Sequence, residues 1–197
     1  EETIQEFLYE LAKELNPRSQ SRIISGLKSF FSYLLFEEYR HDNPMELIET
    51  PKTGRKLPDT LSVADIDRII GAIDLTKREG NFNIGERNRA MLETLYGCGL
   101  RVSELINLKI SDLYFEEGFI KITGKGNKQR FVPIGTTTQD YILLYKNLVR
   151  NQLLVQKGFE DTLFLNRRGK GLTRAMVFII IKGLAQKIEL NKTISPH

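Results

Sequence analysis

The chain has 197 residues, enough for one large or two small domains, and its apolar fraction of 41% is enough for a buried core. Its formal net charge of +4 suits a polyanionic partner, although a basic domain without such a partner has the same balance. The single cysteine, Cys98, excludes an intrachain disulfide, no apolar run approaches the ~20 residues of a membrane span, and no signal-peptide pattern opens the chain. We therefore expect a cytoplasmic protein.

Two amphipathic helices are expected first. Apolar residues at helical spacing predict one helix over residues 1–15 and a second over residues 19–38, separated by the helix-breaking pair Asn16-Pro17. The early turns of the second helix are basic and rich in hydroxyl groups, which suits phosphate contacts because free backbone N–H groups also point there. A solvated face is the alternative interpretation. The candidate phosphate-contacting residues of this helix are Arg18, Ser21, Arg22 and Lys28.

Residues 51–58 have the composition of an extended linker, with two prolines, one glycine and three cations. These cations either follow a DNA backbone or only keep the segment in solution. A position between two DNA-contacting domains favours the first role for Arg55 and Lys56. The sequence therefore predicts a helical domain over residues 1–50, with candidate phosphate contacts, and a second domain over residues 59–197.

The second domain is expected to be mainly helical with a small antiparallel β-sheet. Ser62 and Asp65 form a variant of the capping box at the start of its first helix, and Thr173 occupies the cap position of its last helix. The remaining elements are predicted helices over 86–96, 102–108 and 138–156, and a short extended element over 163–165.

Apolar runs at 119–122 and 131–134 flank a glycine-rich turn and predict a β-hairpin. Pro133 indicates an edge position or a strand end, because proline cannot donate a hydrogen bond to a neighbouring strand. The turn reads Gly-Lys-Gly-Asn-Lys-Gln-Arg over residues 124–130 and places Lys125 at the tip.

A second glycine-rich motif reads Gly-Cys-Gly-Leu-Arg-Val-Ser-Glu-Leu over residues 97–105. Two glycines around one residue permit positive φ and a sharp reversal, which can re-aim the next helix so that Arg101 faces a cleft. Glu104 follows at a spacing of three, within reach of Arg101. Arg101 on a rigid helix start and Lys125 on a hairpin tip can both reach one phosphate. The Gly-Lys-Gly sequence could also suggest a nucleotide-binding loop, but it lacks the ending and the helix start of a P-loop.

These two motifs, together with the closing Ile-Ser-Pro-His of residues 194–197, resemble the bacterial Xer-type tyrosine recombinases in order and approximate spacing. The resemblance runs from about Pro17 to His197. It implies that Arg101, Lys125 and His197 are catalytic and that Glu104 orients Arg101. It also implies that no cofactor and no metal is needed, because clustered guanidinium groups stabilise the charge on the phosphate.

The remaining cations of the second domain are expected to contact phosphates rather than to do chemistry. Arg174 lies in the first turn of the last helix, where a cation opposes the helix dipole and therefore suits an anionic partner. The other candidates of this kind are Lys128 and Arg130.

The resemblance implies site-specific recombination of duplex DNA through a 3′-phosphotyrosyl intermediate, with chromosome dimer resolution as the favoured role. The implied partners are a recombination site, a homo- or hetero-tetramer with a related recombinase, and a cell-division DNA translocase as activator. The family's second arginine and nucleophilic tyrosine would follow His197, so we expect the 197 residues to lack a C-terminal part and to be inactive alone. The alternatives are a phage or mobile-element integrase and a non-catalytic DNA-binding protein on the same fold.

Overall fold

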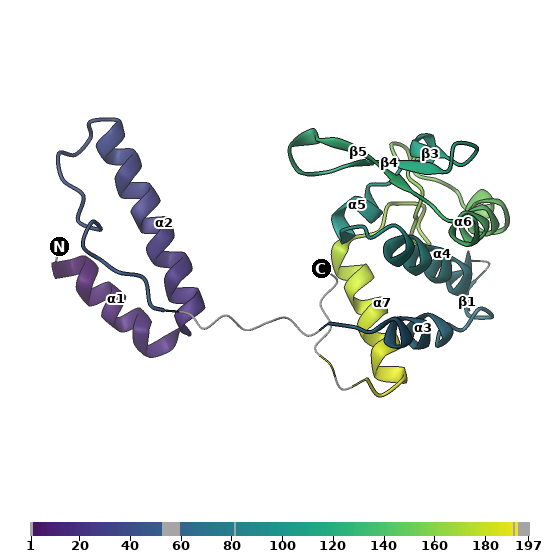
Figure 1. The fold of residues 1–197 in the computed structure, drawn as a ribbon, viewed down its shortest axis with the longest axis horizontal. Helices are drawn as coiled ribbons and strands as arrows, with labels where there is room; N and C mark the ends of the chain where they lie inside the picture. Colours follow the sequence, from purple (N-terminus) through teal and green to yellow (C-terminus); the bar gives the residue numbers. More distant parts are fainter. Residues whose placement is uncertain (1, 53–59, 81, 191, 193–197) are drawn as a thin grey trace. The chain divides into compact units, whose positions relative to one another are not determined.

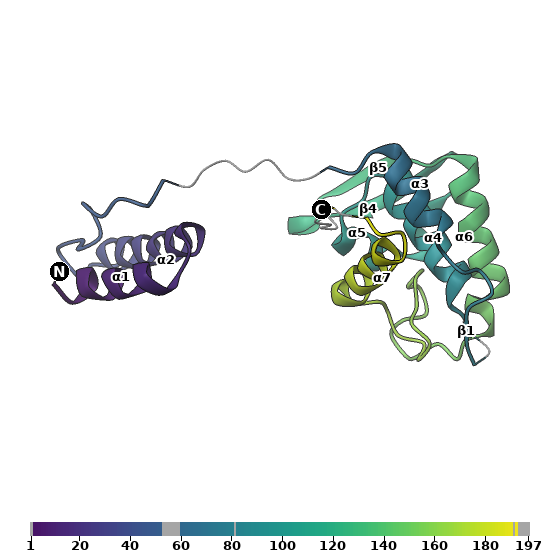
Figure 2. The ribbon, with the colours of Figure 1, turned by 90° about the horizontal axis from the view of Figure 1, so that it is seen from below.

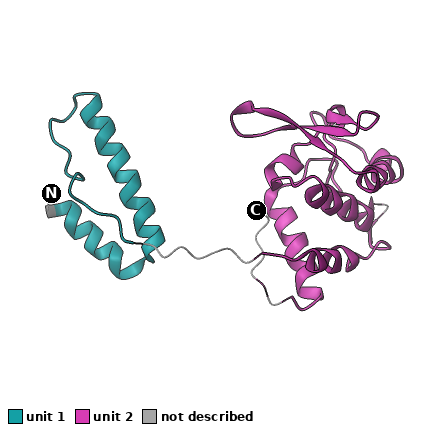
Figure 3. Cartoon of the chain, viewed as in Figure 1, with its two compact units in different colours: residues 1–58 teal, residues 59–197 magenta. Residues whose placement is uncertain are grey.

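The computed structural model describes residues 2–52, 60–80, 82–190 and 192, drawn as a coloured ribbon in Figure 1. The chain divides into two units, residues 1–58 and residues 59–197 (Figure 3). Most of the predicted linker lies outside the described residues, and so do Arg55, Lys56 and His197. None of the described helices combines the length and the apolar character that crossing a membrane requires.

The first unit is a pair of helices, α1 (Glu2–Glu14) and α2 (Pro17–Phe36), followed by a non-helical return (Figure 1). The side chain of Asn16 accepts hydrogen bonds from the backbone N–H groups of Arg18 and Ser19, at 3.1 and 3.0 Å. Asn16 and Pro17 are therefore the cap and first residue of α2, because proline fits the first helical position. The predicted break is correct, and α2 begins two residues earlier than expected.

The second unit is built on α4 (Ile84–Gly97), which packs against α6 (Thr136–Leu148) and α3 (Val63–Gly71). The shorter α5 (Val102–Ile106) and the C-terminal α7 (Arg174–Lys187) complete the helices, as Figures 1 and 2 show. The described residues of this unit also include the 3₁₀ turns η1 (Ile110–Asp112), η2 (Lys125–Asn127) and η3 (Arg150–Gln152). The core residues include Met91, Leu105, Ile120, Ile142, Tyr145 and Phe164.

Local capping signals in the second unit are confirmed. Ser62 and Asp65 form the predicted capping box, with the Ser62 hydroxyl oxygen accepting from the Asp65 backbone N–H at 3.2 Å and the Asp65 carboxylate accepting from that of Ser62 at 2.9 Å. The side chain of Thr173 accepts from the backbone N–H of Met176 at 3.2 Å and caps α7. Each cap satisfies N–H groups that have no partner within the helix.

The sheet has three antiparallel strands in the order β3 (Leu113–Tyr114), β4 (Phe119–Thr123) and β5 (Gln129–Pro133). The predicted hairpin is β4–β5, and its Pro133 ends an edge strand, as expected. Two very short strands, β1 (Arg78–Glu79) and β2 (Phe82–Asn83), form a second hairpin that the sequence did not indicate. Strands of two residues show no alternation, so the sequence carries no signal for them. The fold is mainly α with small antiparallel sheets, as predicted.

The prediction of one long helix over residues 138–156 was wrong beyond Leu148, where α6 ends. The cause is Arg150, which is buried and donates to backbone carbonyls of a later loop. Its Nε donates to the carbonyl of Thr162 at 3.0 Å and its Nη2 to that of Glu160 at 2.6 Å. A buried guanidinium needs hydrogen-bond acceptors, and here the acceptors are carbonyl groups of the later loop. The chain therefore leaves the helix just before Arg150, so that its side chain can contact them.

Candidate active site

The break between α4 and α5 sets the direction of Arg101. α4 ends at Gly97, Gly99 has a φ of +57°, and the N–H of Leu100 donates to the carbonyl of Leu95 at 3.0 Å. Gly97 itself is helical, and a Cβ there would lie 2.8 Å from the Oγ1 of Thr138. Only Gly99 therefore uses the positive φ predicted for this motif, whereas Gly97 allows the close approach of α6.

Glu104 lies beneath Arg101 at the start of α5. Its carboxylate accepts from the backbone N–H of Arg101 at 2.9 Å and from Arg101 Nη1 at 3.2 Å. The side chain of Glu104 is 3% exposed, whereas that of Arg101 is 73% exposed. The buried acid therefore fixes the base of an outward-facing arginine, the contact expected from their spacing of three residues.

Arg130 of β5 binds the same carboxylate. Its Nη1 donates to Glu104 Oε1 at 2.7 Å and its Nη2 to Oε2 at 3.0 Å, a bidentate pair. The hydrogen bonds from Arg130, followed by those from Arg101, lower the pKa of Glu104 to about 2 although burial opposes the shift. Sequence reasoning missed this pair, because nothing local joins Glu104 to a residue 26 positions later.

The turn that carries Lys125 is closed by backbone contacts. The N–H of Gly124 donates to the carbonyl of Lys128 at 2.8 Å, and Gly126 and Asn127 have φ values of +73° and +59°. Lys125 and Lys128 are exposed, and neither has a carboxylate within ion-pair distance among the described residues. Their charges are therefore available to an anion.

Residues from α5 and the hairpin line one pocket of about 720 Å³. The lining residues are Arg101, Ser103, Glu104, Asn107, Thr123, Gly124, Lys125, Lys128, Gln129 and Arg130. Four cations and one carboxylate leave an excess of three positive charges. The structure thus brings Arg101, Glu104, Lys125, Lys128 and Arg130 together, in a pocket whose excess of positive charge suits a phosphate group.

The other predicted site residues lie elsewhere. Arg18 and Arg22 are exposed on the first turns of α2, Lys28 is partly buried farther along it, and Arg174 is exposed at the first position of α7. The hydroxyl of Ser21 lies 3.0 Å from the carbonyl oxygen of Pro17 and 3.3 Å from that of Pro51, within hydrogen-bonding distance of both. Ser21 therefore also holds the return segment against α2.

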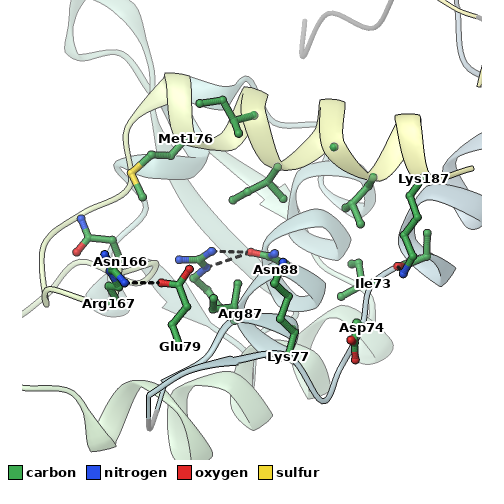
Figure 4. Close-up of a pocket in the computed structure, with 17 residues that line it drawn as sticks. Ile73, Asp74, Lys77, Glu79, Arg87, Asn88, Asn166, Arg167, Met176 and Lys187 are labelled. Carbon is green, nitrogen blue, oxygen red and sulfur yellow. Dashed lines mark hydrogen bonds and ion pairs between the residues drawn. The ribbon is translucent and has the colours of Figure 1, made fainter.

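A second pocket of about 720 Å³ lies among the segment that follows α3, the start of α4, and α7 (Figure 4). At its floor Arg87 is 5% exposed and donates through Nε and Nη2 to the side-chain oxygen of Asn88, at 3.1 and 2.8 Å. Arg167 pairs with Glu79 at 3.4 Å across the same pocket. Acids, cations and aliphatic side chains are mixed in its lining, and it contains no residue predicted from the sequence to act on phosphate.

No group of three or more histidine, cysteine or acidic side chains within the described ranges is placed to hold a metal ion. The donors that surround the pocket under the hairpin are instead guanidinium, ammonium and amide groups, which bind anions directly.

Residues 60–197 match the family model described as the phage integrase family. The chain belongs to the phage integrase family. Tyrosine recombinase XerD of Staphylococcus haemolyticus (strain JCSC1435) is 43% identical over 197 residues, which are 100% of this chain and 65% of that protein. The predicted resemblance to Xer-type tyrosine recombinases is therefore confirmed, and the chain spans less than two thirds of this relative's length.

Solved structures of the same group share the fold. The XerH site-specific recombinase bound to palindromic difH substrate, in a post-cleavage complex, matches with a TM-score of 0.79 and 23% identity. That match covers 98% of this chain and 57% of the other. The XerA recombinase matches with a TM-score of 0.60 and 27% identity, over 98% of this chain and 64% of the other.

Proposed function

We propose that the whole protein is a site-specific DNA recombinase that cuts and rejoins duplex DNA through a 3′-phosphotyrosyl intermediate. The observation that carries this proposal is the pocket between α5 and the β4–β5 hairpin, where the anchored Arg101 and the exposed Lys125 meet. Family membership supports it, but a fold alone hosts many functions, so the chemistry must come from the site.

The proposed reaction is a metal-free transfer of a phosphoryl group. A tyrosine oxygen attacks the scissile phosphorus while Arg101 donates hydrogen bonds to the non-bridging oxygens, whose negative charge grows in the transition state. The bond to the 5′ oxygen breaks, and Lys125 gives that oxygen a proton. The reverse steps join the 3′ phosphate to a new 5′ hydroxyl, so the bond energy is conserved and no nucleotide cofactor is consumed.

The attacking tyrosine is assigned to the part of the whole protein that lies outside these 197 residues. None of the pocket's lining residues is a tyrosine, and the XerD relative is longer than this chain. By resemblance, His197 relays a proton or stabilises the phosphorane-like state.

We assign contacts with the DNA backbone to both units. The cations on α2 would hold the backbone of the duplex in the first unit, with Arg174 and Lys128 adding phosphate contacts in the second. Two further properties complete the proposal: a tetramer with a related recombinase on two sites, and chromosome dimer resolution in the cytoplasm. A phage or mobile-element integrase is the alternative on the same chemistry.

The test is recombination by the complete protein. Fragmented genomic DNA from the source organism, incubated with the protein and recovered with it, identifies the bound site. Two directly repeated copies of that site on a plasmid should then yield two smaller circles. A plasmid that is bound with saturable affinity but returned unchanged, with every candidate partner recombinase added, would exclude the recombinase and favour a non-catalytic DNA-binding protein.

A further inference from the structure

The inference concerns Arg130 and rests on the proposed function. We propose that Arg130 is a positioning residue: it clamps β5 onto Glu104 and thereby holds Lys125 where it can protonate the departing 5′ oxygen. On this view its main role differs from that of Lys128, which ends the turn and is exposed.

The clamp joins two elements that are distant in sequence. The Glu104 carboxylate receives four hydrogen bonds, two from Arg101 at the N-cap of α5 and two from Arg130 of β5. The shortest of the four, at 2.7 Å, comes from Arg130. Because Glu104 is buried on a rigid helix, the carboxylate is a fixed point to which the hairpin is tied.

The clamp acts close to Lys125. In the ladder Arg130 pairs with Ile122, three residues before Lys125, and Ile122 is the last buried residue before the turn. A Cβ on Gly124 would lie 3.5 Å from Glu104 Oε1 and 3.9 Å from Arg130 Nη1, so the residue before Lys125 rests on the clamp.

Little else fixes this end of the hairpin. Residues 125–131 are all exposed, and the hairpin extends beyond the helices beside α5 (Figure 1). Among the described residues, the ion pairs and side-chain hydrogen bonds that join the hairpin from Ile122 to Arg130 to the helices are those between Arg130 and Glu104, whereas Lys121, nearer the base, pairs with Asp112 of η1 at 2.9 Å. Without them the tip would keep its hydrogen-bonded strands but lose its fixed distance from Arg101.

The geometry of Arg130 suits a clamp better than a phosphate contact. Both terminal nitrogens donate to one carboxylate in a planar fork, which fixes orientation as well as distance. A lysine offers a single ammonium and cannot reproduce this fork. Arg130→Lys keeps the charge and removes the bidentate geometry, so it separates positioning from simple attraction of DNA.

The test uses a substrate that does not need the proton. In an ordinary site the 5′ oxygen leaves as an alkoxide unless it is protonated. When a sulfur atom replaces this bridging oxygen, the departing thiolate is a much weaker base and leaves without help. Loss of the lysine's function should therefore slow cleavage of the oxygen ester and spare the sulfur ester.

The experiment measures cleavage of both esters by the complete protein, at saturating DNA, for wild type and for Arg130→Lys, Arg130→Met and Lys125→Ala. We expect Lys125→Ala to lose about 10²-fold or more on the oxygen ester, the usual share of general acid catalysis. Both Arg130 variants should lose about 10-fold or more on the oxygen ester and less than about 3-fold on the sulfur ester. Arg167→Met, which removes an arginine paired with an exposed Glu79, should match wild type on both.

Equal losses on both esters for the two Arg130 variants, at unchanged melting temperature for Arg130→Lys, would overturn the inference, and so would no loss on either. If the wild type cleaved neither ester, that result would instead contradict the proposed function. The two failures are thereby distinguished.

Discussion

The basic start of α2 and the pocket under the β4–β5 hairpin both gather cations, but they hold them in different ways. On α2, Arg18 and Arg22 are exposed and have no ion-pair partner among the described residues. In the pocket, Arg101 and Arg130 share the buried carboxylate of Glu104. The first arrangement favours screened, additive attraction to a polyanion, whereas the second fixes donors in advance of a developing charge.

This difference separates the cations that contribute to DNA affinity from those that contribute to the rate of catalysis. Exposed cations contribute to affinity through the counterions that they displace, and each one is replaceable. Anchored donors contribute to a rate because they need no reorganisation when the transition state forms.

The strongest test removes the anchored arginine. Arg101→Ala should lower the recombination rate of the complete protein by about 10²–10³-fold, the usual cost of one preorganised donor to a developing oxyanion. DNA affinity should change by less than about 3-fold, since the other cations remain. Gel-shift titration measures the DNA affinity and the plasmid assay measures the recombination rate. An equal loss of affinity and rate would show that Arg101 does not act on catalysis separately from binding.

Glu104→Gln tests whether the buried carboxylate organises the pocket. This change leaves two partly exposed guanidinium groups around a neutral amide, and losing their hydrogen bonds to a charged, buried acceptor costs about 1.5–3 kcal/mol. We expect the free energy of unfolding of the second unit, measured in urea, to fall by an amount of that order. Glu79→Gln provides the control, because its exposed pair with Arg167 contributes about 1 kcal/mol or less. Equal effects of the two substitutions would show that Glu104 is not the anchor.

Acid should loosen the same anchor. The folded-state pKa of Glu104 lies near 2, below its ordinary value of 4.5, so its stabilisation is complete above about pH 4.5 and is lost as the pH falls toward 2. The shift corresponds to a contribution on the order of 3 kcal/mol. Subtracting the urea midpoints of Glu104→Gln from those of wild type between pH 5 and pH 2.5 isolates this contribution. A difference that stays constant with pH would contradict the assignment.

Arg22→Ala is the matched change on α2 and should have the smallest effect. Loss of one exposed phosphate contact should weaken DNA binding several-fold and reduce the slope of log affinity against log salt by about one. The recombination rate at saturating DNA should stay within about 2-fold of wild type, because the cation takes no part in the chemistry. A large loss of recombination rate with an unchanged salt slope would contradict the assignment of Arg22 to DNA affinity alone.

Sequence reasoning succeeded where the signal is local. The capping box of Ser62 and Asp65, the cap at Thr173 and the β4–β5 hairpin all depend on residues a few positions apart, and all are present. It failed where contacts at longer range decide. The end of α6 is set by Arg150 and carbonyls 9 to 12 residues later, and the main partner of Glu104 comes 26 residues later.

The sequence predicted which residues form the candidate site more fully than it predicted what each of them does. Motif spacing indicated Arg101, Glu104 and Lys125, and the structure places them in one pocket. The sequence could not separate Arg130 from Lys128, because both are cations in the same turn motif. Only the tertiary contact shows that Arg130 donates to a buried acid while Lys128 does not.

The central claim is that a tyrosine of the complete protein attacks a phosphate held by Arg101 and Lys125. The most direct measurement is covalent trapping on a recombination site nicked beside the scissile phosphate, so that the cut strand is lost and religation is blocked. The account predicts an adduct that survives denaturation, joins a tyrosine to a 3′ phosphate, and forms with wild type but not with a DNA-bound Arg101→Ala variant. Saturable binding of the nicked site with no adduct, or an adduct that Arg101→Ala forms equally well, would contradict it.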